Sequence, residues 1–160
     1  MAREHGYGVR VAWIGPAVGS TTTYAGYSRE HTIAFEGKSV ALRGSADPAF
    51  RGDPALPNPE EMLVAALASC HLLSYLSLCG RAGIEVLAYE DRARGTMTEH
   101  GGSGRFVEVT LFPVVTIARE NDRERALALH AEAHATCFIA NSVNFPVRHE
   151  PEIRVAAAAR

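Results

Sequence analysis

A long apolar stretch without proline, residues 60–83, most constrains how this chain folds. It reads EEMLVAALASCHLLSYLSLCGRAG, which predicts a helix running to about Arg81. Asn58 is a good N-cap, and Glu61 completes a capping-box pattern with it. Gly83 is suited to end the helix at its C-terminal side. The stretch therefore predicts one long helix with defined ends.

The same helix is apolar on every side from Met62 to Ala68, which is typical of a helix buried all round. The chain has 160 residues, the length of one domain, and we expect a single domain over residues 1–160. One small domain can hardly cover such a helix on every face. We therefore expect a second copy of the chain to cover part of it, as a homodimer.

The remaining chain is typical of strands that come in pairs. Strand-like segments are expected at 6–15, 31–44 (a hairpin that turns at Glu36 and Gly37), 85–97, 105–118 and the end of 138–155, with a second helix at 122–137 for which Asp122 is a possible cap. The strands do not alternate with helices along the chain. This order predicts an α+β fold with antiparallel sheets.

Charge and composition exclude several classes of partner. The formal net charge is -2, which gives no reason to expect binding to nucleic acid or to an anionic membrane surface. The N-terminal residues lack the apolar segment of a secretory signal, and polar residues interrupt the apolar stretch too often for a membrane-spanning helix. We therefore expect a cytoplasmic protein. Because disulfides are rare in the cytoplasm, its three cysteines are not expected to form a disulfide scaffold.

The three cysteines have two alternative interpretations. Cys70 lies in the middle of the long helix and Cys137 near the end of the second helix, so a contact between them would depend on the fold. Both are reactive thiols, or both are small apolar side chains that fill a core. Cys79 comes nine residues after Cys70, about 13.5 Å along a helix, so these two cannot pair within one straight helix. We interpret Cys79 as structural.

Metal binding is a further alternative. His130, His134 and Cys137 follow one another at helical spacing and fall on one face of the second helix. Histidines four apart on a helix, together with a cysteine, are ligands that zinc uses. The sequence offers no clear fourth ligand, and His71 supplies one only if the fold brings it there. The alternative is that these histidines form hydrogen bonds or line a pocket.

Two cysteine-bearing segments resemble a known family. NPEEMLVAALASCH (58–71) and HAEAHATCFIANSV (130–143) resemble the two cysteine motifs of the OsmC/Ohr family, the osmotically inducible and organic-hydroperoxide-resistance proteins. YSREHTIAFEG (27–37) resembles the arginine-bearing region of that family, and residues 44–61 resemble the loop that leads into its central helix. His71 stands where better-known members tend to have an aromatic residue, so the chain is similar to an OsmC-like branch.

This resemblance implies an OsmC-like fold, in which antiparallel sheets wrap around long central helices in an intertwined homodimer with active sites at the interface. It implies a cysteine-based peroxidase that reduces organic hydroperoxides to alcohols without a cofactor. By the motifs, Cys70 matches the cysteine that attacks the peroxide and Cys137 the resolving cysteine. Arg29 matches the arginine that stabilises the thiolate, and Glu60 matches the glutamate that holds this arginine.

The implied cycle passes through a Cys70 sulfenic acid and a Cys70–Cys137 disulfide, which an external dithiol reduces; lipoyl groups on proteins are the expected donors. Glu60 and Cys70 are ten residues apart, about 15 Å along a straight helix. We therefore expect Glu60 to act on the Cys70 of the other subunit, so that two chains build each site. A dimer that is not an enzyme, with unreactive thiols, is the remaining alternative.

Overall fold

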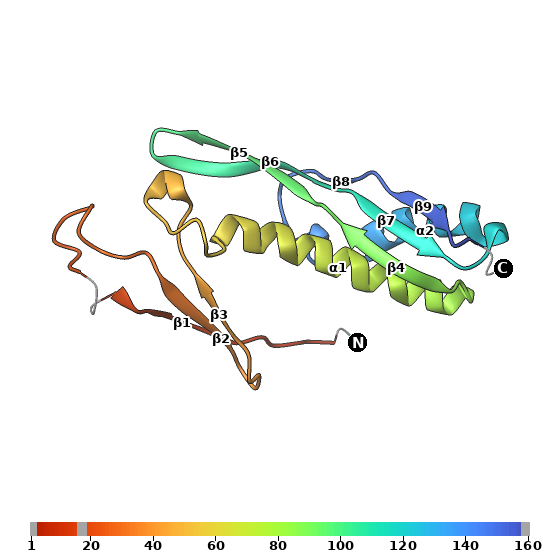
Figure 1. Ribbon diagram of the computed structural model, residues 1–160, viewed down its shortest axis with the longest axis horizontal. Helices are drawn as coiled ribbons and strands as arrows, with labels where there is room; N and C mark the ends of the chain where they lie inside the picture. Colours follow the sequence, from red (N-terminus) through yellow and green to blue (C-terminus); the bar gives the residue numbers. More distant parts are fainter. Residues whose placement is uncertain (1–2, 16–18, 158–160) are drawn as a thin grey trace. The chain divides into compact units, whose positions relative to one another are not determined.

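The computed structural model describes residues 3–15 and 19–157 and shows a mixed α+β chain (Figure 1). The chain divides into two compact units, Met1–Met62 and Leu63–Arg160. The α+β class predicted from the order of segments is confirmed.

The first unit is a small antiparallel sheet. Its strands are β1 (Val9–Trp13), β2 (His31–Phe35) and β3 (Ala41–Gly44), in the order β1-β2-β3. The predicted hairpin over 31–44 is confirmed, and Gly37 makes its turn with a φ of 71°, which glycine adopts without a steric penalty. A short 3-10 helix, η2 (Pro48–Phe50), follows the sheet.

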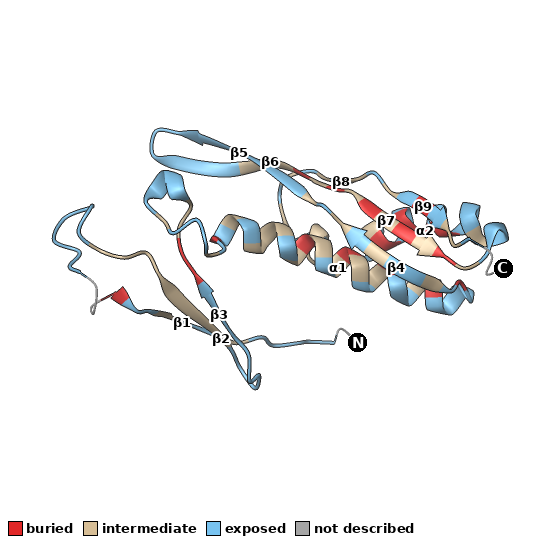
Figure 2. Cartoon of the chain, viewed as in Figure 1, coloured by how far each residue is buried: buried red, intermediate tan, exposed pale blue. Residues whose placement is uncertain are grey.

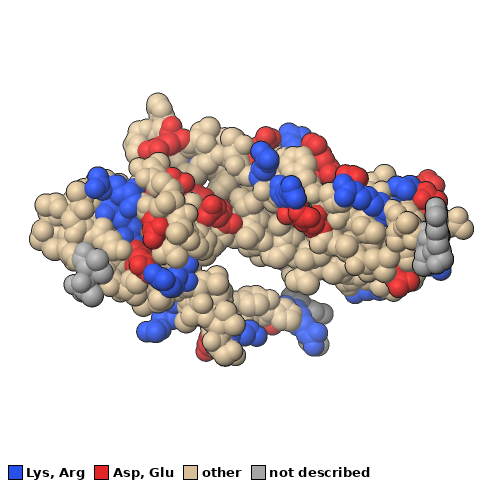
Figure 3. Space-filling view, viewed as in Figure 1, with Lys and Arg blue, Asp and Glu red and all other residues tan. Residues whose placement is uncertain are grey.

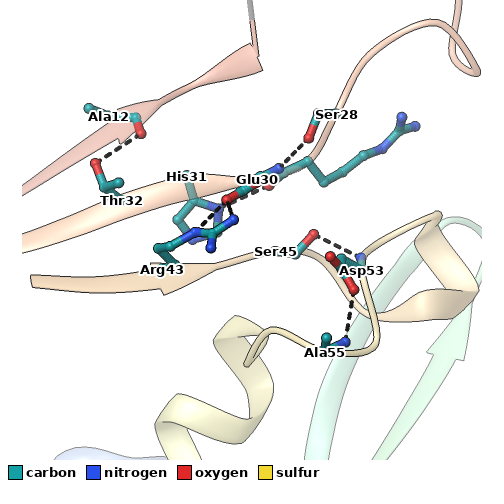
Figure 4. Close-up of polar contacts among 10 residues, drawn as sticks. Ala12, Ser28, Glu30, His31, Thr32, Arg43, Ser45, Asp53 and Ala55 are labelled. Carbon is teal, nitrogen blue, oxygen red and sulfur yellow. Dashed lines mark hydrogen bonds and ion pairs between the residues drawn. The ribbon is translucent and has the colours of Figure 1, made fainter. Parts of the chain in front are cut away.

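Polar side chains hold this unit together where apolar burial is small, as Figure 4 shows. Arg43 Nε donates a hydrogen bond of 2.6 Å to Glu30, which joins β3 to the residue before β2. Ser45 Oγ accepts a bond of 3.0 Å from the backbone N–H of Asp53 and closes the loop around η2. The fold of the first unit therefore depends on local hydrogen bonds and strand pairing.

The long helix α1 spans Pro59–Ala82, as predicted. Its capping box is present: Asn58 Oδ1 accepts from the N–H of Glu61 at 2.8 Å, and the N–H of Asn58 donates to Glu61 Oε2 at 3.0 Å. Gly83 follows the helix with a φ of 69°, the left-handed conformation expected of a C-terminal cap. Both ends of this helix therefore lie where the capping residues in the sequence predict them.

The second unit contains two three-stranded sheets and a second helix. The elements are β4 (Val86–Asp91), β5 (Arg94–His100), β6 (Ser103–Leu111), β7 (Pro113–Ile117), η3 (Glu120–Asp122), α2 (Arg123–Thr136), η4 (Ala140–Ser142), β8 (Val147–His149) and β9 (Glu152–Val155). One sheet has the order β4-β7-β9 and the other β5-β6-β8. The pairs β4–β7 and β5–β6 are antiparallel, whereas β6–β8 and β7–β9 are parallel.

The prediction of two unbroken strands at 85–97 and 105–118 is wrong, because each is divided between the two sheets. The second break falls at Phe112, whose N–H donates to the carboxylate of Asp91 at 2.8 Å. The next residue, Pro113, has no N–H to donate. A carboxylate and a proline thus end one strand and begin another within a run that looks continuous.

Two further details differ from the sequence prediction. The C-terminal segment forms two short strands, β8 and β9, separated by a break that contains Pro151, and each pairs in parallel, so the sheets are mixed. Asp122 precedes α2 but makes no capping hydrogen bond with its side chain, which accepts from Arg119 Nε at 2.8 Å. The arginine competes with the helix end for this carboxylate.

The core of the second unit lies along one face of α1 (Figure 2). Leu67, His71, Tyr75 and Cys79 recur every four residues and are all buried. On another side of the helix Leu73 is 66% exposed, so the expectation of burial all round is not met within one chain. Contrary to the expectation from the sequence, α1 is long and apolar enough to cross a membrane by length and composition alone, a criterion that core helices of soluble proteins also meet.

Candidate functional site

The structure brings the two predicted reactive cysteines together. Cys70 lies on α1 and is half-buried, whereas Cys137 follows the last residue of α2 and is 1% exposed. The two thiols lie close enough together for Cys70 to raise the pKa of Cys137, and both cysteines are free. Two thiols 67 positions apart in the sequence are therefore neighbours in the fold, as disulfide formation requires.

The surroundings of Cys137 favour its neutral form. Burial and then the hydrogen bond with Cys70 raise the pKa of Cys137 to about 11. Hydrogen bonds from the backbone at Ala140 and Ile139 oppose this shift in pKa without cancelling it. At neutral pH Cys137 is thus a thiol, in contact with a more accessible cysteine.

The third cysteine has different surroundings. Cys79 is buried, and burial raises the pKa of its thiol against the smaller opposing effect of a hydrogen bond with Tyr75. Its surroundings are an apolar core cluster of the second unit, which includes Val115 and Leu129. This placement fits the structural role that sequence spacing predicted.

The predicted charged residues belong to the first unit. The Arg29 guanidinium lies over the ring of Tyr27, 3.8 Å from its centroid, and 4.8 Å from that of Tyr24. It donates hydrogen bonds of 2.5 Å to the carbonyl oxygens of these two tyrosines. Glu60 stands in the first turn of α1, half-buried. That Arg29 and Glu60 act on the thiols stays a prediction.

Four histidines form a cluster beside the cysteine-bearing helices: His71 on α1 and His130 on α2 are buried, and His134 on α2 and His149 on β8 are half-buried. His71 Nε2 and His130 Nδ1 share a hydrogen bond of 3.0 Å, and their rings are nearly parallel, 5.3 Å apart. The ring of His149 lies 5.6 Å from that of His71 and 5.4 Å from that of His134. Tyr75 stacks on His130, with its ring 3.9 Å from that of the imidazole.

Burial keeps the two inner members of this cluster, His71 and His130, neutral. Desolvation, followed by the nearness of other histidines, lowers the pKa of His71 to about 4 and that of His130 to about 3. Burial lowers the pKa of His149 as well. Within residues 3–15 and 19–157, one ring nitrogen of each of the four histidines is buried without a hydrogen-bond partner. Above pH 6 His71 and His130 therefore carry no charge.

The structure does not favour the metal-binding alternative that used His130, His134 and Cys137. Among the described residues, no three histidine, cysteine or acidic side chains are placed so that they could hold one metal ion. His130 instead directs Nδ1 at His71, and its ring is stacked at 12° to that ring. Metal ligands direct their nitrogens at a common centre, and these two direct them at each other.

Sequence reasoning missed the cluster as a unit, because it considered His71, His130 and His134 as metal ligands and did not consider His149. One signal was present: Leu67, His71, Tyr75 and Cys79 have the spacing of a single helix face. Nothing in the sequence indicated that β8 would bring a fourth imidazole to that face.

The charged side chains add no further site on the face that Figure 3 draws. Lysine and arginine are interspersed there with aspartate and glutamate. Several charged side chains of the chain form ion pairs with residues close in the sequence, such as Arg123 with Glu120 and Arg154 with Glu152. Such exposed pairs contribute little to stability or binding.

Comparisons with known proteins give the chain a family. A family model described as OsmC-like protein matches residues 52–152. A solved OsmC-like protein of unknown function from Vibrio cholerae is 33% identical, with a TM-score of 0.83 over 92% of this chain and 99% of that one. No curated protein matches the chain significantly.

Two more distant structures carry a name that mentions a function. An organic hydroperoxide resistance protein from Elizabethkingia anophelis is 14% identical, with a TM-score of 0.68 over 98% of this chain and all of that one. An organic hydroperoxide resistance protein from Legionella pneumophila is 16% identical, with a TM-score of 0.66 over 96% of this chain and all of that one. At such identities the likeness shows a shared fold.

Proposed function

This chain belongs to the family of OsmC-like proteins, and we propose that it reduces organic hydroperoxides to alcohols with Cys70 and Cys137. One observation carries the proposal: a half-buried thiol on α1 neighbours a fully buried thiol after α2, closely enough to raise its pKa. The names of two structural relatives, organic hydroperoxide resistance proteins, support the choice of substrate. Cys70 is partly accessible to solvent, as a thiol that reacts with a substrate must be, whereas unreactive cysteines that only fill a core have no need of such access.

The proposed chemistry balances with these two sulfurs and an external dithiol. The Cys70 thiolate attacks the terminal oxygen of the hydroperoxide, and the O–O bond breaks. The terminal OH group is now bound to sulfur as a sulfenic acid, and the alkoxide takes up a proton and leaves as an alcohol. The Cys137 sulfur then attacks the sulfenic sulfur, loses its proton to the departing hydroxide, and water leaves. A dithiol, such as a protein-bound lipoyl group, reduces the disulfide by two exchange steps.

Arg29 and Glu60 complete the proposed site. A guanidinium beside Cys70 favours the thiolate, the form that attacks peroxides. Because Glu60 lies about 15 Å from Cys70 along α1, we propose that two chains of a homodimer build each site. We also propose that the protein works in the cytoplasm, where thiol pools regenerate it.

Exposed apolar side chains next to both cysteines favour an organic substrate over hydrogen peroxide. Leu73 is 66% exposed and lies one helical turn after Cys70, and Phe138, the neighbour of Cys137, is 78% exposed. Apolar surface of this kind binds hydrocarbon groups of a ligand. We expect cumene hydroperoxide to react faster than hydrogen peroxide.

Intact mass spectrometry after one equivalent of cumene hydroperoxide tests the proposal. The wild type is expected to lose two hydrogen atoms, and Cys137→Ser is expected to gain one oxygen atom as a sulfenic acid. Cys79→Ser is the matched control and should behave as the wild type, because Cys79 is buried elsewhere in the core. Undiminished hydroperoxide consumption by Cys70→Ser would overturn the proposal.

A further inference from the structure

We propose that His71 and His130 are positioning residues that hold Cys70 and Cys137 at the separation needed for a disulfide. Their hydrogen bond of 3.0 Å joins the two helices that carry the cysteines. This inference deepens the proposed function, because it concerns the same two thiols. It assigns a role to a buried pair that the peroxidase chemistry itself does not use.

The pair lies close to both sulfurs along the chain. His71 directly follows Cys70 on α1, so any shift of His71 moves Cys70 with it. On the other side, His130 stands in α2, and Cys137 is tied to the end of that helix by a bond of 3.2 Å from its N–H to the carbonyl of His134. A rigid helical segment therefore transmits the position of each imidazole to a cysteine.

Two polar contacts fix the register of α1 on α2. Besides the imidazole pair, the Tyr75 hydroxyl donates a bond of 3.2 Å to the carbonyl of Ala126. The two contacts are four residues apart on each helix, and they are the side-chain hydrogen bonds that join α1 to α2 in the described part of the chain. Apolar contacts are not directional, whereas hydrogen bonds weaken steeply with distance and angle. The polar contacts therefore prevent the helices from sliding.

The pair is better suited to setting a position than to adding stability. Both rings are 0% exposed, and His71 Nδ1 and His130 Nε2 have no partner among residues 3–15 and 19–157. Burying unpartnered nitrogens is costly, so apolar side chains of similar size would stabilise the core more. Stacking by Tyr75 on one side and His149 on another keeps the two rings from turning away.

The test is a thiol–disulfide equilibrium with glutathione, in a Cys79→Ser background so that one disulfide can form. The thiols of Cys70 and Cys137 lose two electrons and two protons to oxidised glutathione, which gives the intramolecular disulfide and two reduced glutathiones. The equilibrium constant is the effective concentration of one thiol at the other. No hydroperoxide is present, so the result does not depend on peroxidase activity.

We expect His71→Leu to lower this effective concentration about tenfold, because it removes one directional bond between the helices. His71→Gln should restore it to within about twofold, since its amide presents a donor and an acceptor near the position of Nε2. His100→Leu, at an exposed histidine at the end of β5, is the matched control and should leave the value unchanged.

A double variant separates a specific pair from general loosening of the core. His130→Leu and His71→Leu/His130→Leu should both lower the effective concentration by the same factor as His71→Leu, because all three remove one shared bond. Circular dichroism checks that each variant is folded. If His130→Leu is not folded, His130→Met takes its place.

Equal values for wild type, His71→Leu and His130→Leu would overturn the proposal, as would losses that multiply in the double variant. If the effective concentrations change as expected but the protein does not reduce hydroperoxides, the positioning role stands and only the peroxidase function is overturned.

Discussion

The two units of this chain differ in how much of their structure is buried. In the second unit, β7 alternates between buried and half-buried residues, and Val115 and Ile117 are completely covered. In the strands of the first unit, Gly44 is the one fully buried residue among those described, and Val9 and Val11 are each more than 60% exposed. Both units have regular strands, but burial of apolar side chains stabilises one of them far more than the other.

This difference extends to the candidate site. Cys70 and Cys137 are neighbours in the well-packed unit, on α1 and just after α2, two helices that buried polar contacts join. Arg29 is held in the sparsely packed unit, by two tyrosines from its own loop. The pair of thiols is therefore preorganised by a core, whereas the position of the cation depends on local contacts.

The largest expected effect on the free energy of unfolding comes from truncating one leucine side chain to alanine in each of the two units. Leu129→Ala in α2 should lower the free energy of unfolding by about 2–5 kcal/mol, because Leu129 is 1% exposed in a core cluster. Leu42→Ala on β3 should cost less than about 1 kcal/mol, because Leu42 is already 39% exposed. Urea unfolding followed by circular dichroism measures both.

An equally large loss in Leu42→Ala would contradict the comparison, because it would show that the first sheet is covered in solution. Repeating the measurement over a range of protein concentrations identifies the cover: a midpoint that rises with concentration indicates a second copy of the chain.

The sequence predicted those features that depend on local chemistry. The ends of α1 follow from Asn58, Glu61 and Gly83, whose side chains or conformations act within one turn of the helix. The two cysteines were identified from motifs, and the fold class from the order of the segments. Each of these signals comes from residues that are close together in the sequence, so a single sequence was enough to predict these features.

Features that depend on distant segments were not predicted. A continuous β pattern gave no sign that Asp91 would accept the N–H of Phe112 and divide two strands between two sheets. The histidine cluster needs α1, α2 and β8 to meet, and the spacing of His71 and His130 in the sequence does not report this. Tertiary contacts decide such features, and local patterns are silent about them.

The second largest effect is a loss of stability in mild acid, confined to the well-packed unit. The pKa of His71 is about 4 when the protein is folded and near 6.5 when it is unfolded, so the unfolded chain binds the proton more tightly. The contribution of His71 is complete above pH 6.5, falls as the pH drops, and is lost below about 4. Relative to pH 7, this costs on the order of 3 kcal/mol at pH 4.

His71→Gln should remove this part of the pH dependence, because glutamine does not titrate. His100→Gln is the control, since this histidine is exposed on β5, and it should keep the acid sensitivity of the wild type. Urea unfolding between pH 4 and 7.5 gives the comparison. Parallel pH curves for His71→Gln and wild type would show that His71 does not carry the effect.

The smallest expected effect lies in the loop that holds Arg29. Tyr27→Leu removes a ring 3.8 Å from the guanidinium and should destabilise the loop by about 0.5–1 kcal/mol, the usual worth of a cation–π contact at an exposed site. Hydrogen exchange should accelerate about two- to fivefold for amides of residues 20–30. Amides of α1 and α2 should keep their protection, because local contacts of the first unit hold this arginine. Faster exchange in both helices would show that the loop is coupled to the packed core, and the contrast between a thiol pair set by the core and a cation set by its loop would no longer hold.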